Sequence, residues 1–384
     1  MNKKEIAEIR KLLTKDHCRI DRITGCYVNG EKETVMEMRE AFLSLPEEEM
    51  HKYCAIFKKA LSGTIGKHLM TLEFPLAEEA PDGRQAALLS LRDTALEDDA
   101  VLRKMYDEII NAWQYAGNYL ILFAFGRYDV PGSTSDRLTL DDASDYVYSF
   151  VVGCICPVNL SKEGLCYDPD QNTFLNKLRD QMVEMPDAGF LFPAFTDRNT
   201  DLHNVLYYTS KPKELHGAFL EGVLGIEPPL TAETQHSTFS ALVEETFQRD
   251  CDFEVAKEIH EKLGEVIAEA AASDDPEPPV LDEHAVRVIL TQCGATDEQM
   301  ASFAERYEEL TGDDEILASN VHAARKFEIV SPDVKVSVAA DRTDLVETRI
   351  LDDGREYLVI PLDGDVEVNG IRIRRKRSTD SENP

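Results

Sequence analysis

Apolar residues recur along the first 114 residues with two different periods. A spacing of three or four positions places them on one face of a helix, whereas alternation or a short continuous run indicates a strand. The helical spacing predicts helices over residues 3–13, 35–43, 46–59 and 83–114, the last broken near Asp98. The extended pattern predicts strands over residues 19–28, which end at the turn pair Asn29-Gly30, and over residues 68–74.

From residue 119 the pattern becomes extended and predicts a sheet. Four strands are expected, at residues 119–128, 147–158, 189–195 and 204–209. The short gaps between them favour antiparallel pairing, because parallel neighbours need longer crossover connections. Most of these runs are apolar at successive positions, so we expect helices on both faces of the sheet.

Helical spacing returns after residue 215 and continues through two acidic amphipathic helices. The Pro-rich segment at residues 273–279 cannot continue a helix and predicts a linker. Two further helices and then several short strands follow it, with Asp-Gly and Asn-Gly turns that favour hairpins. The helices are expected at residues 215–224, 231–248, 252–271, 281–292 and 297–310, and the hairpin turns at residues 352–355 and 369–370.

These elements predict an α+β protein. We expect a central, mainly antiparallel sheet with flanking helices, an acidic helical segment, and a small C-terminal domain of helices plus a β-meander of four or five strands. The expected division is residues 1–225 for the α+β domain, 226–272 for the acidic helical segment packing on it, 273–280 for the linker, 281–373 for the small α+β domain and 374–384 for a basic and then polar tail.

The charge of the chain is strongly negative and unevenly distributed. There are 73 Asp and Glu against 41 Lys and Arg, which gives a formal net charge of −32. Residues 221–315 alone carry 25 acidic and 5 basic side chains. This charge disfavours nonspecific attraction to phosphate backbones or anionic membranes. The acidic segment is interpreted as a solvated surface, a docking face for a basic partner, or a nucleic-acid mimic.

The first residues carry charges where a signal peptide needs an apolar core, and no apolar run approaches the roughly 18 residues of a membrane helix. The eight cysteines lack the spacing of a disulfide framework, which fits a reducing compartment. We therefore expect a cytoplasmic protein with no membrane partner. No cofactor is predicted.

Three cysteines in and after the longest apolar run are candidates for a metal site. Cys154, Cys156 and Cys166 would supply thiolates to zinc. Structural zinc sites usually have at least two residues between paired ligands, whereas only one residue separates Cys154 from Cys156. The alternative interpretation, small apolar side chains in the core, is favoured.

A polar loop between two predicted strands contains Asp197, Arg198, Asp201 and His203. Carboxylate, guanidinium and imidazole groups this close together can bind an anion or transfer protons, with Lys162 at the end of a neighbouring strand as a further candidate. The same residue types also stabilise ordinary turns through their own backbone. Both interpretations remain open from the sequence.

The C-terminal basic cluster is a candidate contact for nucleic acid. It consists of Arg372, Arg374, Arg375, Lys376 and Arg377. Two alternatives are a merely solvated tail and a tail that neutralises the acidic helices of the same chain.

Three segments carry a resemblance to a known family: Val152-Gly-Cys-Ile-Cys-Pro-Val-Asn-Leu-Ser-Lys162, Gly189-Phe-Leu-Phe-Pro-Ala-Phe-Thr-Asp-Arg198 and Leu206-Tyr-Tyr-Thr209. With Asp341-Arg-Thr-Asp-Leu-Val-Glu-Thr-Arg349, the chain resembles a bacterial, clostridia-type family filed as a domain of unknown function. The resemblance spans nearly the whole chain and implies a bacterial cytosolic protein without assigned catalytic residues. In the order of its parts, the chain is also similar to an acidic bacterial nucleoid-associated protein family.

Two functional hypotheses follow. The first is a non-enzymatic cytosolic interaction protein, nucleoid- or nucleic-acid-associated, with a protein partner or a second copy of itself. The alternative is a metal-assisted hydrolase or nuclease that uses the loop from Asp197 to His203.

Overall fold

The computed structural model describes residues 1–14, 17–133, 139–177, 179–273, 278–312, 314–323, 325–362, 366–368 and 371–373. Its centre is an eight-stranded sheet in which every pair of neighbours is antiparallel. The order is β2-β1-β4-β5-β9-β12-β3, with β8 also paired to β5. The strands are β1 (Ile20–Val28), β2 (Thr34–Ala41), β3 (Leu69–Glu73), β4 (Asn118–Ser133), β5 (Thr139–Leu160), β8 (Gln181–Val183), β9 (Ala188–Phe192) and β12 (Asn204–Thr209). The predicted α+β class and the mainly antiparallel sheet are confirmed.

Helices cover both faces of this sheet because its central strands are apolar on both sides. Along β4, Leu120, Leu122 and Ala124 face one apolar core, while Ile121 and Phe123 face the other. The first core also contains residues of α1 (Lys3–Lys11) and α2 (Glu47–Lys59). The second contains residues of α3 (Arg84–Asp93), α4 (Asp99–Ala112), α5 (Gly217–Phe219) and the π-helical turn η3 (Leu220–Leu224).

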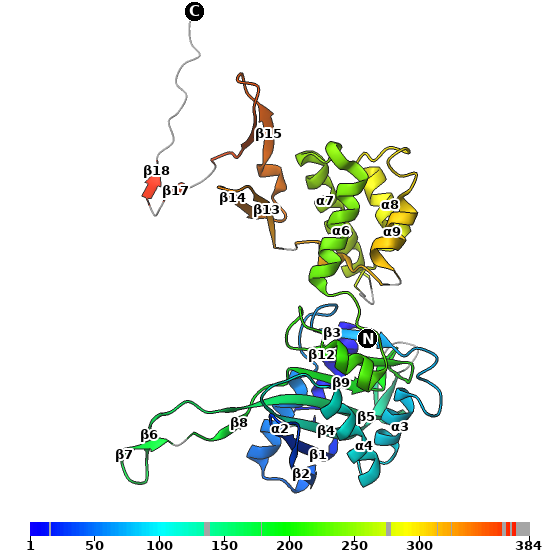
Figure 1. The fold of residues 1–384 in the computed structure, drawn as a ribbon, viewed down its shortest axis with the longest axis vertical. Coiled ribbons are helices and arrows are strands. Elements are labelled where there is room, and N and C mark those ends of the chain that lie inside the picture. Colours follow the sequence, from blue (N-terminus) through cyan, green and yellow to red (C-terminus); the bar gives the residue numbers. More distant parts are fainter. Residues whose placement is uncertain are drawn as a thin grey trace, which may run out of the picture.

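A second group of helices lies above the sheet in Figure 1 and has its own apolar core. It comprises α6 (Ala232–Phe247), α7 (Phe253–Ala271), α8 (Glu283–Gln292), α9 (Phe303–Thr311) and α10 (Ala318–Val321). The acidic helices α6 and α7 thus share buried residues with α8 to α10, where we expected them to pack on the sheet. The predicted domain boundaries stay a prediction, and residues 274–277 of the expected linker lie outside the described residues.

The sheet body and the second, helical body meet where α10 contacts the turn before β3. The Asn320 amide donates to the carbonyl of Gly66 at 3.0 Å and to the Gln235 side chain at 2.8 Å. Gly66 has a φ of 78°, and a Cβ there would lie 2.4 Å from Cδ1 of Leu317. The positive φ, which residues other than glycine rarely adopt, therefore favours glycine at this position.

The helix predicted for residues 35–43 is wrong. Residues 34–41 form β2, which pairs with β1 through a hairpin at Asn29-Gly30. Val35, Met36 and Leu43 are exposed, so their helical spacing did not mark a buried face. Pairing with β1 decides the conformation, as the Asn-Gly turn between the two runs indicates.

The C-terminal strands also differ from the expected meander. They form three separate two-stranded hairpins in the described part of the chain: β13 (Lys326–Val330) with β14 (Lys335–Ala339), β15 (Glu347–Ile350) with β16 (Glu356–Val359), and β17 (Val366–Val368) with β18 (Ile371–Ile373). The predicted helix at residues 297–310 begins only at Phe303, because residues 297–302 form turns.

A long hairpin, which the sequence did not predict, projects from the sheet at the left of Figure 1. It consists of β6 (Gly164–Asp168) and β7 (Thr173–Lys177), which pair with each other, and returns to the sheet through β8. We call residues 160–185 the arm. Over the described residues, no helix has both the length and the apolar character needed to cross a membrane.

Candidate functional site

The candidate cysteines do not come together. Cys154 and Cys156 are fully buried in β5 within the core under α1 and α2, and burial raises the pKa of both thiols. Cys166 is exposed on β6 in the arm. Within the described ranges, no three His, Cys, Asp or Glu side chains are placed to hold a metal ion.

Asp197 and Arg198 are the two loop residues of a tight hairpin. They join β10 (Ala194–Thr196) to β11 (Asn199–Asp201), and Thr196 pairs with Asn199 across the turn. Their φ angles are 52° and 55°. Two positive φ values in a two-residue loop are typical of a type I′ turn, which tolerates Asp and Asn well. Turn chemistry thus explains the positive φ of Asp197, whereas an arginine such as Arg198 rarely adopts one.

The hairpin is held by α1, which the sequence did not reveal. The buried carboxylate of Glu5 accepts hydrogen bonds from the backbone N–H of Asp197 at 2.6 Å and of Asn2 at 2.7 Å. Glu8 accepts a hydrogen bond from the Tyr128 hydroxyl at 2.8 Å and one from Arg198 at 3.2 Å. Burial together with Glu8 raises the pKa of Tyr128 to about 12. Both acids of α1 are therefore occupied on its inner side.

The other members of the predicted loop site point elsewhere. Asp201 accepts hydrogen bonds from the backbone of His203 and the amide of Asn204. The exposed His203 ring pairs with Glu79 at 2.6 Å, and this hydrogen bond raises the pKa of His203.

Lys162 is exposed just beyond the C-terminal end of β5. The hairpin contacts β5 near its other end, where the Tyr146 hydroxyl donates to the carbonyl of Arg198. The structure therefore does not bring Lys162 to the loop.

Of the C-terminal basic cluster, Arg372 lies on β18, is exposed and faces Glu367 of β17 in the register. Arg374, Arg375, Lys376 and Arg377 lie outside the described residues.

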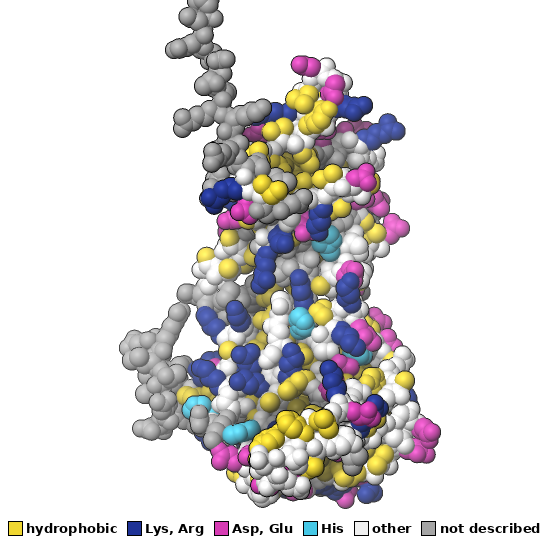
Figure 2. All heavy atoms as spheres, turned by 90° about the vertical axis from the view of Figure 1, so that its left-hand side faces the viewer, with side chains coloured by type: hydrophobic (Ala, Val, Ile, Leu, Met, Phe, Trp, Pro, Cys, Tyr) yellow, Lys and Arg dark blue, Asp and Glu magenta, His cyan; other side chains and the backbone are white. Residues whose placement is uncertain are grey.

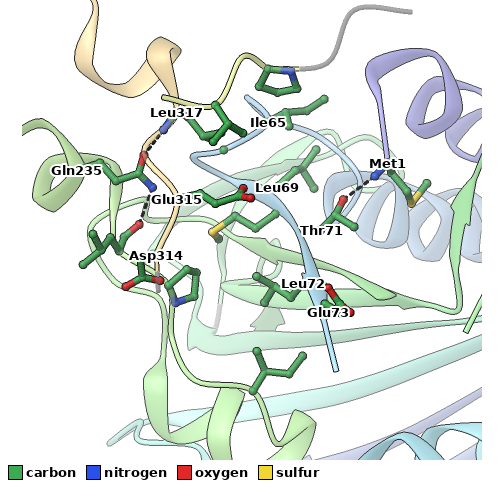
Figure 3. A pocket seen from close by; sticks show the side chains of 17 residues that line it. Met1, Ile65, Leu69, Thr71, Leu72, Glu73, Gln235, Asp314, Glu315 and Leu317 are labelled. Atoms are coloured by element: carbon green, nitrogen blue, oxygen red, sulfur yellow. Dashed lines mark hydrogen bonds between the residues drawn. The ribbon is translucent and has the colours of Figure 1, made fainter. Parts of the chain in front are cut away.

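A cleft of about 480 Å³ lies beside the edge strand β3, and we call it the β3 cleft. It is lined by Met1 and by residues of four segments, 65–73, 226–235, 278–280 and 314–317. Figure 3 shows β3 on one side and the segment with Glu315 and Leu317 on the other. The Met1 amine donates to the Thr71 hydroxyl at 2.7 Å. A volume of this size falls in the usual range of ligand pockets, roughly 300–1,000 Å³.

The walls of the β3 cleft are connected by hydrogen bonds. The Gln235 side chain accepts from the backbone N–H of Leu317 at 3.0 Å and donates to the carbonyl of Leu230 at 3.0 Å. Val280 and Leu317 form an antiparallel bridge, which the backbone of Leu281 and Ile316 extends. The cleft therefore has a defined shape before anything enters it.

A second candidate surface is basic. Lys and Arg on α1 and α2 are exposed or half-exposed on the side of these helices that faces away from the sheet: Lys3, Lys4, Arg10, Lys11, Lys52, Lys58 and Lys59. We call this set the basic face. α2 lies on the left of the lower body in Figure 1, the side toward which Figure 2 looks. Figure 2 shows Lys and Arg side chains gathered across the middle of that side.

Most cations of the basic face form no ion pair among the described residues. In the part of the chain that the structure describes, six of them have no carboxylate within ion-pair distance: Lys3, Arg10, Lys11, Lys52, Lys58 and Lys59. Lys59 lies over the ring of Tyr208, 6.0 Å from its centroid. Unpaired cations attract an anionic ligand more strongly than paired ones, since no internal partner must first be displaced.

These features define an α+β protein with a cleft at one sheet edge and a basic surface over one sheet face. A family model described as "Domain of unknown function (DUF4317)" matches residues 1–371, so the chain belongs to this family. The search of curated proteins finds no match for the chain.

Proposed function

We propose that this protein is a cytosolic, non-enzymatic interaction protein that binds nucleic acid through the basic face. The observation that supports the proposal is a set of six Lys and Arg on α1 and α2 that have no carboxylate partner among the residues that the structure describes, on a chain of net charge −32. Lysine and arginine that neutralise phosphates release counterions, which drives binding without a need for sequence recognition.

The overall negative charge does not prevent such binding. The acid is concentrated in residues 221–315, and the acidic helices α6 and α7 belong to the second body. At physiological salt, charges on the surface are screened beyond about 8 Å. A nucleic acid on the basic face thus interacts mainly with the nearest cations, while the acidic body limits how it can be oriented.

The test is a fluorescence-anisotropy titration of the full chain with labelled double-stranded DNA, single-stranded DNA and RNA at two salt concentrations. We expect Lys3→Gln, Lys11→Gln and Lys52→Gln together to weaken binding and to flatten the salt dependence by about one unit of slope per lost phosphate contact. The control replaces the same number of lysines by Gln: Lys32, Lys104 and Lys213. These residues lie at the opposite sheet face or beside it. Absence of binding at low salt would refute the proposal.

The basic tail is tested in the same titration. A chain that ends at residue 371 lacks all five cations of the cluster. Unchanged binding by this shortened chain would assign the contact to the basic face alone, whereas a loss would assign a share to the tail.

We further propose self-association through the arm, on a separate observation. Eight large apolar side chains are exposed there: Leu160, Leu165, Tyr167, Phe174, Leu175, Met182, Val183 and Met185. Leu165 is 72% and Phe174 is 66% exposed. If each exposes roughly 100 Å², compared with the 150–250 Å² of a whole buried aromatic side chain, the arm presents roughly 800 Å². That is comparable to the area that one partner contributes to a standard interface.

Light scattering coupled to size exclusion tests this second proposal. We expect the full chain to be dimeric, and Leu165→Ser with Phe174→Ser to shift it to the monomer. Leu76→Ser is the control, since Leu76 is 86% exposed outside the arm. Cys166, exposed on β6, is a natural crosslinking reporter for two arms that meet. A monomer at every concentration would contradict the proposal.

A further inference from the structure

The β3 cleft contains an unused sheet edge. We infer that it binds an extended peptide segment of a partner protein, with alternating apolar and Lys or Arg side chains, which adds to β3 as the ninth strand of the sheet. This inference is independent of the nucleic-acid and self-association proposals, because it uses a different surface and a ligand of a different class.

The alternation of hydrogen bonds along β3 shows which of its backbone groups do not bond to β12. Phe74 N–H donates to His203, and Thr209 N–H donates to His68, so residues 68, 70, 72 and 74 are the ones that bond to β12. The intervening residues 69, 71 and 73 direct their N–H and C=O groups to the other edge. Leu69 already bonds to the turn at residues 64–66.

Thr71 and Glu73 are left with outward N–H and C=O groups, for which the structure records no backbone partner among the described residues. These residues line the β3 cleft. Two residues with four outward groups suffice for one short ladder of an added strand, the mode by which extended peptides join exposed sheet edges.

The side chains around this edge define the chemistry of the occupant. Apolar side chains line much of the cleft, with Ile65, Leu69, Leu72 and Leu317 among its walls. Its charged side chains are Glu73, Asp314 and Glu315, and the one cation among the lining groups, the Met1 amine, is bonded to the Thr71 hydroxyl. A strand presents alternate residues to opposite sides, so apolar residues toward the walls and basic residues toward the carboxylates complement the cleft.

The wall opposite β3 is held in place before a strand binds. Gln235 and the bridge between Val280 and Leu317 hold its segments together, and the Asn320 contact to Gly66 joins it to the turn before β3. A preformed site avoids the entropic cost of ordering loops on binding.

The experiment is a titration of the full chain with a fluorescein-labelled peptide of three Val-Lys repeats. We expect saturable binding, at least tenfold weaker for the same peptide with Glu in place of Lys. The variant with both Glu73→Gln and Glu315→Gln should bind the Lys peptide about fivefold more weakly. Its affinities for the Lys peptide and the Glu peptide should therefore differ less than those of the natural chain.

Backbone pairing is tested separately. Thr71→Pro removes an N–H that points away from β12, so the sheet is retained while the added strand is blocked. We expect at least a tenfold loss, whereas Thr71→Val, which keeps the N–H, binds like the natural chain. Circular dichroism of both variants verifies the fold.

Peptide variants keep the inference testable even where Thr71→Pro does not fold. Two N-methylated forms of the Lys peptide, methylated at alternate residues, block one or the other edge of the bound strand. One form should lose binding and the other should retain it. The inference would be overturned if both N-methylated forms bound as tightly as the parent peptide. It would also be overturned if the Glu peptide bound as tightly as the Lys peptide, or if the Lys peptide did not bind at all.

Discussion

The helix pairs α1–α2 and α6–α7 are both amphipathic, yet they carry opposite charge. α1 and α2 contain seven Lys and Arg against five Asp and Glu, whereas α6 and α7 contain two against eight. Two of the five acids in the first pair, Glu5 and Glu8, are bonded on the inner side of α1. The difference teaches that a net charge of −32 describes the chain but not the surface that a ligand meets.

A similar contrast exists between the two faces of the sheet. Over α3 and α4, the arginines have acidic partners: Arg84 pairs with Glu108 at 2.7 Å, and Arg92 with Asp93 at 2.6 Å. Over α1 and α2, six cations have none among the described residues. Cations that are already paired contribute little to the attraction of an external anion, so counting Lys and Arg per helix would miss the distinction.

The largest effect is expected from reversing the charge of the basic face. Lys3→Glu, Lys11→Glu and Lys52→Glu together should weaken nucleic-acid binding by about a hundredfold at low salt, because attraction at three phosphates becomes repulsion. The measurement is the anisotropy titration described above. The converse variant should not weaken nucleic-acid binding; it carries Glu254→Lys, Glu258→Lys and Glu269→Lys on α7. Weaker binding by this variant would contradict the contrast drawn between α1–α2 and α6–α7.

The next effect concerns stability and separates a buried acid from exposed ones. Glu5→Ala leaves the backbone N–H groups of Asn2 and Asp197 without their acceptor, so we expect a loss of about 2 kcal/mol in the free energy of unfolding. Urea denaturation measures it. Glu254→Ala on the exposed side of α7 is the control and should change the value by less than about 0.5 kcal/mol. Equal effects would show that the inner bonds of Glu5 contribute no stability.

Thiol reactivity gives a third test of the same two regions. A hydrogen bond from the Cys54 thiol, whose Sγ lies 3.9 Å away, lowers the pKa of Cys18 to about 7. Burial raises the pKa of Cys251, which precedes α7. At pH 7, iodoacetamide should therefore modify Cys18 about ten times faster than Cys251, as peptide mass spectrometry can follow. Cys54→Ala should slow the reaction of Cys18, and no change would contradict the assigned cause.

The smallest effect is expected within the second body. The rings of His260 and His322 stack 4.3 Å apart, near Phe327, and burial lowers the pKa of both. The folded protein then keeps them neutral, while the unfolded chain takes up protons below about pH 6.5. Stability is thus lost as the pH falls through this value.

Both rings are half-exposed and Glu261 lies beside His260, so the loss should stay below about 1 kcal/mol. Urea denaturation at pH 7.5 and pH 5.5 measures it. His322→Phe keeps the aromatic contact and should reduce the pH dependence. If the stability of His322→Phe depended on pH as strongly as that of the natural chain, the dependence would belong to other titratable groups.

Local signals in the sequence predicted much of the fold. The break between α3 and α4 is visible because Asp98 caps α4, with its side chain accepting from the N–H groups of Ala100 and Val101. The acidic first turn and basic last turn of α2 likewise mark its ends. These features depend on neighbours within one turn of helix, and for that reason the sequence reveals them.

The parts that the sequence did not reveal depend on partners outside the element itself. β2 is a strand because it pairs with β1, although its apolar residues have helical spacing. The arm was not predicted because residues 160–185 have no clear period. The β3 cleft was not predicted because it combines residues as far apart in the chain as Met1 and Leu317. The sequence makes the loop at Asp197 a candidate site. It does not reveal that Glu5, 192 residues away along the chain, accepts a hydrogen bond from the backbone N–H of Asp197.

The sheet order also determines when each strand can be completed during synthesis. β3 ends at Glu73, but its partner β12 begins only at Asn204. At a translation rate of about 5–20 residues per second, roughly 7 to 26 seconds pass before the first neighbouring strand of β3 is synthesised. Leu69, Leu72 and the other apolar residues of this strand are thus without a partner strand throughout that interval. We therefore expect the nascent chain to expose an apolar segment that chaperones can bind until residues 204–209 have emerged.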